Sequence, residues 1–173
     1  MDTISLFRQQ FKEATALLAT VMQGVTHDQA HWKPPGTANP LGATYVHTLM
    51  TQDRVANQNI KGGATLISTT WANKTGLSEP PPMGDQVAAW AQWARLLQVD
   101  LEASKAYGEA VAESVDQVLQ SLTETELTRT ITTPFGTPTV RFLVTQALVG
   151  HTHEHIGEIA CLKGLQGGKG FAI

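Results

Sequence analysis

The residues with the clearest chemical use lie in the run His151-Thr152-His153-Glu154-His155, near the end of the 173-residue chain. On an α-helix, side chains four residues apart share a face, whereas side chains two residues apart point in different directions. His151 and His155 can therefore aim both imidazole rings at one point, and His153 is expected at the surface. Because imidazole is a common ligand of divalent metal ions, the pair indicates a metal site.

The same two histidines stand where helical periodicity requires apolar core residues. They continue the three-four spacing of Val144, Leu148 and Leu162. Two buried imidazoles without partners would lose their hydrogen bonds, and two buried imidazolium ions would repel each other. A cation shared between the rings removes both problems.

A helical pair supplies two ligands, so the third is expected from a facing helix. His47 lies inside the next suitable segment, whereas His27 and His31 lie in a short turn bounded by prolines and are assigned to that turn. Three neutral imidazoles leave at least one coordination position open, which is typical of a catalytic site and not of a structural zinc site.

Glu158 lies about one turn beyond His155. Its carboxylate could accept the distal N–H of that ligand or act as a base at the metal, and it could equally be an ordinary exposed glutamate. Glu154 and Asp53 are weaker candidates for supporting the ligands.

Three further side chains could lie near the site, and each also has a purely structural explanation. Trp90 is expected in the core and Cys161 is expected as buried filler away from the metal face. Trp71 either lines a pocket mouth or folds back onto the helices.

The segments that must position these residues have helical periodicity, which predicts an all-α fold. Proline and glycine separate four long segments, Asp2–Gly24, Asn39–Ile60, Asp85–Leu122 and Thr137–Gly164. As one helix, the third would be longer than its partners, so a bend or an overhang near Gly108 is expected. The pattern is typical of a four-helix bundle with one long crossover connection, here Gly62–Gly84.

Composition narrows the function classes. The chain has 12 Lys and Arg against 15 Asp and Glu, a net charge of -3 and no basic run, which argues against nucleic-acid binding. It has no run of about 20 apolar residues and no signal-like N-terminus. We therefore expect a cytoplasmic protein and not a membrane protein. With 42% hydrophobic residues, we expect a single domain over residues 1–173.

The order of these motifs resembles the DinB-like (DinB/YfiT) family of small metalloproteins. The resemblance depends on Trp32-Lys33-Pro34-Pro35 before the helix with His47, and on a last helix with His-x-x-x-His followed by Ile156-Gly157-Glu158. Members often have Arg-Gly-Gln after the last ligand, so this chain replaces a cation by isoleucine and an amide by a carboxylate.

The resemblance implies a four-helix bundle, often dimeric, with zinc, nickel or a similar divalent ion on His47, His151 and His155. Characterised members include thiol-dependent S-transferases and isomerases that use low-molecular-weight thiols such as bacillithiol or mycothiol. We therefore expect a metal-dependent enzyme, a homodimer, that activates such a thiol for transfer to a small electrophile.

Two alternatives remain open at this point. The open site could hold hydroxide for hydrolysis with Glu158 as the base, or the protein could be a non-enzymatic, metal-binding, stress-associated dimer. In each enzymatic case the partner is a small-molecule substrate.

Overall fold

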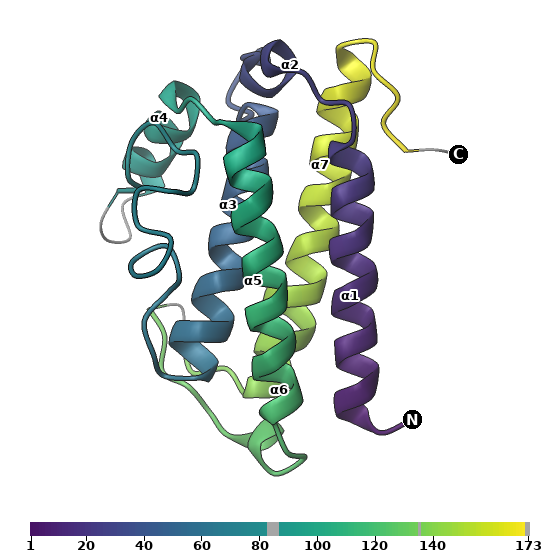
Figure 1. The fold of residues 1–173 in the computed structure, drawn as a ribbon, viewed down its shortest axis with the longest axis vertical. Coiled ribbons are helices and arrows are strands. Elements are labelled where there is room, and N and C mark those ends of the chain that lie inside the picture. The colour runs from purple at the N-terminus through teal and green to yellow at the C-terminus, as the bar shows by residue number, and fades with distance from the viewer. Residues whose placement is uncertain (83–86, 135, 172–173) are drawn as a thin grey trace.

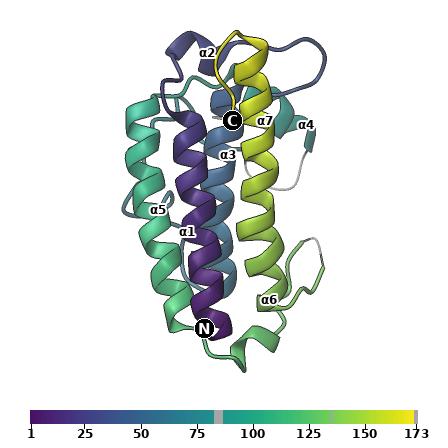
Figure 2. The same ribbon diagram turned by 90° about the vertical axis from the view of Figure 1, so that its right-hand side faces the viewer.

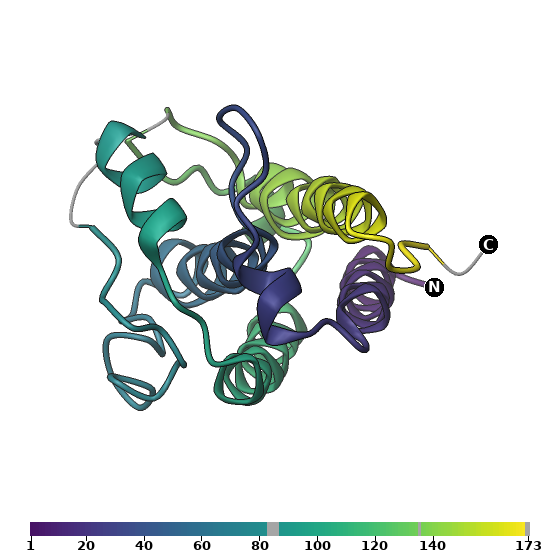
Figure 3. The same ribbon diagram turned by 90° about the horizontal axis from the view of Figure 1, so that it is seen from above.

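Four long helices lie side by side in the computed structural model, which describes residues 1–82, 87–134 and 136–171 (Figure 1). They are α1 (Thr3–Met22), α3 (Leu41–Asp53), α5 (Leu101–Ser121) and α7 (His151–Leu165). Seen from above, they form a square in which α3 contacts α5 and α7, and α1 contacts the same two helices (Figure 3). The predicted all-α four-helix bundle is confirmed.

Capping side chains set the first two helix starts. Asp2 accepts a hydrogen bond from the backbone N–H of Ser5, which begins α1 as predicted. Thr26 and Gln29 form a reciprocal capping box at the start of α2 (His27–His31). Apolar side chains at three-four spacing then bury one face of α1 against the bundle; they are Phe7, Phe11, Ala14, Leu18 and Val21.

The two helices that carry the histidines both contain a π-helical segment. Helix α3 continues as η1 (Arg54–Ile60), so the helical run ends at the residue that the sequence predicts. The last helix begins as α6 (Val140–Phe142) and continues as η3 (Leu143–Gly150) and then α7. Thr139 caps its start by accepting from the N–H of Phe142, slightly later than the predicted start at Thr137. A widened turn therefore stands directly before His151, and such turns recur at functional sites.

The prediction of a single third helix over Asp85–Leu122 was wrong, because the described part of this segment forms two helices. Its first part is α4 (Val87–Leu96) and its second part is α5. Asp100 ends the break between them by accepting from the N–H groups of Glu102 and Ala103, which caps α5. Helix α4 lies outside the square, beside α3 (Figure 3). The predicted start at Asp85 lies outside the described residues.

Helix α5 has no break at Gly108, where a bend or an overhang was expected. Helix α5 runs straight through this position, and a Cβ there would lie 3.1 Å from a methyl carbon of Leu49. The glycine therefore allows close approach of α5 to α3. The crossover has already been made by the long connection before α4, so α5 needs no bend to fit the bundle.

The long connection between η1 and α4 is held by a buried carboxylate. Asp53 is fully buried and accepts hydrogen bonds from the N–H groups of Leu66 and Ile67 and from the Tyr107 hydroxyl. Residues 66–71 form turns, not the brief extended segment that their composition suggests. The connection returns the chain so that α3 and α5 run in the same direction, opposite to α1 and α7 (Figures 1 and 2).

The segment between α5 and the last helix is short and irregular. Thr123 and Glu126 form a capping box before η2 (Glu126–Thr128), and Thr130 pairs with Thr139 in an isolated β-bridge. Within the part of the chain that is described, no helix is both long and apolar enough to cross a membrane.

Candidate metal centre

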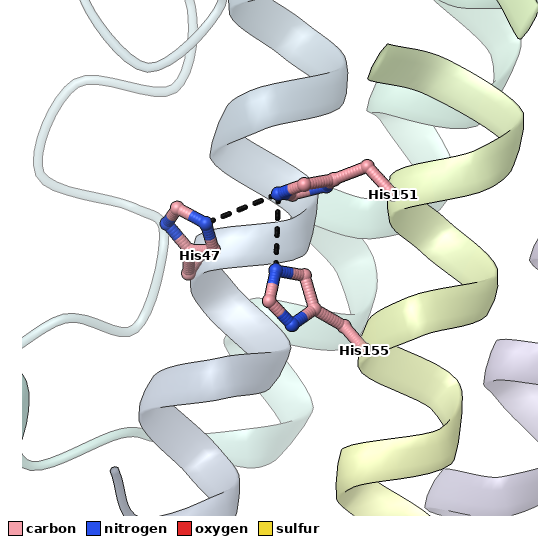
Figure 4. Close-up of side chains that lie close together, drawn as sticks. All are labelled: His47, His151 and His155. Carbon is pink, nitrogen blue, oxygen red and sulfur yellow. Dashed lines mark hydrogen bonds between the residues drawn. The ribbon is translucent and has the colours of Figure 1, made fainter. Parts of the chain in front are cut away.

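Three imidazole rings from two antiparallel helices meet between α3 and α7 (Figure 4). His47 comes from α3, and His151 and His155 come from α7. The Nε2 atom of His151 lies 3.2 Å from Nε2 of His47 and 3.0 Å from Nε2 of His155. Each residue offers one ligand atom, and the three atoms lie within 4.8 Å of one another. The predicted convergence of these residues is therefore present.

The spacing of the nitrogens fits a shared metal ion. Two nitrogens bound to one ion at about 2.0–2.1 Å lie about 2.8–3.0 Å apart at right-angled coordination and about 3.3–3.4 Å apart at tetrahedral angles. The observed 3.0 and 3.2 Å fall between these values. An all-imidazole donor set suits zinc, nickel and related divalent ions.

The rings of His47 and His151 are uncharged at neutral pH. Burial, reinforced by the neighbouring His155, lowers the pKa of His47 to about 4. Burial, reinforced by His155 and His47, likewise lowers the pKa of His151 to about 3. Neutral imidazole is the form that binds metal, so the protein keeps these ligands ready without prior loss of a proton.

Glu158 fixes the tautomer of His155. Its Oε2 atom lies 2.7 Å from Nδ1 of His155, so the ring donates its Nδ1–H to the carboxylate and keeps the Nε2 lone pair for a metal. The side chain of His155 is 17% exposed and that of Glu158 is 58% exposed. The hydrogen bond between Glu158 and His155 is therefore present, whereas the roles of Glu158 as support of a metal ligand and as catalytic base stay predictions.

Trp90 lies beside the centre, which the sequence reasoning missed. Its ring lies edge-on to that of His47, with the centroids 6.2 Å apart. Trp90 is half-buried, and Trp93 takes the buried position on α4 that was assigned to Trp90. The error follows from treating α4 as the start of α5, because α4 packs against a different side of α3.

The remaining histidines do not approach the centre. His153 is exposed, and its Nδ1 faces the carbonyl of Val149. His31 serves the turn, as predicted: its Nε2 accepts the N–H of Val99, so its Nδ1–H donates to the carbonyl of His27.

The other candidates also lie away from the three rings. Asp53 holds the long connection, Glu154 is exposed, and Trp71 packs against Tyr107, with 5.8 Å between ring centroids. Cys161 is exposed, so its assignment as buried filler was wrong. Its position falls on the outer face of α7, where the bundle has no partner helix to cover it.

A buried amide adjoins the centre and was not considered from the sequence. Gln52 is fully buried on α3, and its Nε2 donates to Oγ1 of Thr152, the residue after His151. Across the described residues, two buried side-chain polar atoms have no hydrogen-bond partner, and they are Oε1 of Gln52 and Nδ1 of His151. Only the folded arrangement of α3 and α7 brings these residues together, so the sequence alone carries no signal for them.

Comparison with known proteins agrees with this architecture. The sequence matches the DinB superfamily over residues 10–159, a range that includes all three histidines and Glu158. The chain belongs to the DinB superfamily. The solved structure of a conserved protein from Enterococcus faecalis resembles this DinB-superfamily chain with a TM-score of 0.76 and 16% identity. The likeness covers 95% of this chain and 99% of that one and supports the fold alone. A search of curated proteins found no match.

Proposed function

We propose that this DinB-superfamily protein is an enzyme that uses a divalent metal ion, zinc or nickel, to activate a low-molecular-weight thiol for transfer to a small electrophile. The observation that carries the proposal is the convergence of three imidazoles, from His47, His151 and His155, at distances suited to one ion. Three protein ligands are the number found in catalytic sites, where a position remains for substrate.

The chain's own residues would each have a defined part. His47, His151 and His155 would hold the ion through Nε2, and Glu158 would keep the His155 proton on Nδ1. When bound by neutral ligands, a divalent ion keeps its charge and lowers the pKa of a thiol at the open position. The indole of Trp90, edge-on to His47, would give the apolar part of an electrophile a surface to pack on.

Loss of one ligand tests the proposal. Purified protein loaded with zinc or nickel would be assayed for conjugation of a thiol to an electrophile, with the metal content measured in parallel. His151→Ala is expected to lose both bound metal and thiol-dependent activity. His153→Ala, two residues away and exposed, is the matched control and is expected to retain both. Activity that is unchanged in His151→Ala would refute the proposal.

The same assay separates the two alternatives. Hydrolysis with Glu158 as base would proceed without added thiol, whereas transfer requires it. The bond between Glu158 and His155 favours thiol transfer, because a carboxylate engaged in orienting a ligand is less free to take a proton from water. Tight metal binding without turnover on any thiol would favour the non-enzymatic alternative.

A further inference from the structure

Gln52 is an uncharged polar side chain placed in the interior between α3 and α7, where an apolar residue would pack more favourably. It is fully buried, and so is its partner Thr152. Burying an amide is unfavourable unless its hydrogen bonds are made, yet only the Nε2 side of Gln52 is bonded. A fully buried amide whose oxygen lacks a donor requires an explanation.

The direction of the amide is fixed by Thr152. The threonine hydroxyl has a single proton, which it donates to the carbonyl of Leu148 at 2.6 Å. It can therefore only accept from Gln52, so the NH₂ group of Gln52 faces Thr152 at 2.8 Å. The opposite orientation of the amide would place Oε1 against the Thr152 oxygen, so that two acceptors faced each other. In the observed orientation, Oε1 points away from Thr152 and is available to accept from another donor.

His151 supplies the complementary atom. Its Nε2 faces Nε2 of both His47 and His155, so a metal ion would be bound through Nε2. The proton of the neutral ring then lies on Nδ1, which is buried and has no acceptor among the described residues. Histidines that bind metal usually donate this second N–H to an oxygen, as His155 does to Glu158.

We propose that Gln52 is a positioning residue of the metal centre. Its Oε1 accepts the Nδ1–H of metal-bound His151, directly or through one buried water, and so fixes the ring's tautomer and direction. The two unpartnered atoms are an acceptor on α3 and a donor on α7, and Gln52 is already hydrogen-bonded to Thr152, the residue next to His151. The inference rests on the metal centre of the proposed function and is independent of the thiol reaction.

Metal affinity of paired variants tests the role. Gln52→Met keeps the length of the side chain and removes the acceptor, so the affinity for Zn²⁺, measured by competition with a chelator, is expected to fall about 10–100-fold. Gln52→Glu is expected to restore most of that affinity, because burial favours the protonated carboxyl group, whose O–H can donate to Thr152 while its carbonyl oxygen accepts from His151. In the Co²⁺-loaded protein, the visible absorption should shift in Gln52→Met and return in Gln52→Glu.

A matched control separates positioning from general loss of a buried polar group. Thr48 is also fully buried on α3, but its hydroxyl donates to the carbonyl of Thr44 in its own helix. Thr48→Val is therefore expected to leave Zn²⁺ affinity unchanged. Equal Zn²⁺ affinity in Gln52→Met and the wild type would overturn the inference. A wild-type chain that binds no divalent metal would overturn the metal centre as well.

A measurement on the wild type makes the test independent of how well the variants fold. In Zn²⁺-loaded protein labelled with ¹⁵N-histidine, the ring proton of His151 is expected on Nδ1, with the downfield shift of a hydrogen-bonded N–H. A His151 ring protonated on Nε2 and bound to metal through Nδ1 would overturn the inference. Failure of thiol transfer alone, with metal bound, would leave this result intact.

Discussion

The proposed ligands His155 and His151 would depend on supports of different kinds. His155 is oriented by Glu158 from the same turn of α7, through a bond of 2.7 Å to a carboxylate that is mostly exposed. Removal of an exposed carboxylate leaves no buried group without a partner. The contribution of Glu158 should therefore appear in metal binding and hardly in the stability of the metal-free fold.

Glu158→Ala is expected to weaken Zn²⁺ binding about 10–100-fold. The free energy of unfolding of the metal-free protein should change by less than about 0.5 kcal/mol, since the site is at the surface. Chelator competition and urea unfolding measure the two quantities. Glu154→Ala, an exposed glutamate one turn earlier, is the control and should alter neither. A large loss of stability in Glu158→Ala would assign the residue to the fold instead.

The metal-free protein is expected to lose stability in mild acid. The pKa values of His47 and His151 are lowered in the fold to about 4 and about 3, so below pH 6.5 the unfolded chain binds more protons than the folded one. Each group then removes up to about 1.4 kcal/mol per pH unit between pH 6.5 and its folded value. Urea unfolding in chelator at pH 7, 6 and 5 measures this slope. Replacement of both histidines by Gln should flatten it, and an unchanged slope would contradict the assignment.

At the scale of residues, the convergence of the three histidines was predictable from the sequence, and the contacts around them were only partly so. His151 and His155 lie four apart on a face otherwise apolar, and Glu158 follows within one turn, so local periodicity suffices. Gln52 and Trp90 act across helices, and their contacts depend on tertiary packing that one sequence does not specify. The exposure of Cys161 was not predicted for the same reason. The sequence of one helix does not determine which of its faces has no neighbouring element in the fold.

At the scale of elements, one carboxylate joins a helix to the connection that follows it. Asp53 bonds the N–H groups of Leu66 and Ile67, the Tyr107 hydroxyl and the Nδ2 of Asn57. These bonds hold the connection against α3 and α5. The path of the chain toward α4, the helix that carries Trp90, therefore depends on the hydrogen bonds of Asp53.

Asp53→Asn should release the connection. In this variant, an amide NH₂ group would face hydrogen-bond donors in place of one carboxylate oxygen. At least two hydrogen bonds to the carboxylate would be lost. The free energy of unfolding should therefore fall by at least about 3 kcal/mol. Limited proteolysis should then cut between residues 61 and 82 before any helix is cut. Tyr107→Phe removes one bond and keeps both backbone contacts, so it is the milder control. Equal protease resistance in Asp53→Asn and wild type would contradict the anchoring role.

The helix starts and stops were largely predictable, and the break between α4 and α5 was not. Asp2, Thr26 and Thr123 cap as their sequences indicate, because capping depends on neighbours within one turn. The three-four alternation continues across Leu97–Asp100 even though the helix stops there, since residues on both sides of the break are buried. Asp100 was a local cap signal that the regular alternation concealed.

At the scale of the whole molecule, the site joins two antiparallel helices of the square (Figure 3). The large exposed apolar side chains are distributed over several elements; they are Met1, Leu6, Leu96, Phe142, Leu165 and Phe171. The homodimer stays a prediction, to be tested by the mass of the protein in solution.

Metal binding is expected to stabilise the whole bundle. An ion that binds only the folded chain adds about 2.7 kcal/mol at a concentration 100 times its Kd. The Tm should accordingly rise when Zn²⁺ is added and fall when a chelator removes it. His47→Ala should abolish the rise, and a Tm in the wild type that does not respond to Zn²⁺ would contradict the centre.

His47 and His151 are 104 residues apart along the chain. An ion bound to both would act as a reversible cross-link between α3 and α7, and the loop that it closes spans more than half of the polypeptide. This protein has a single cysteine and can form no disulfide within one chain. The coordination bonds would then be a removable constraint on the fold. Depletion of the metal ion would therefore abolish the proposed activity and destabilise the helix bundle at the same time.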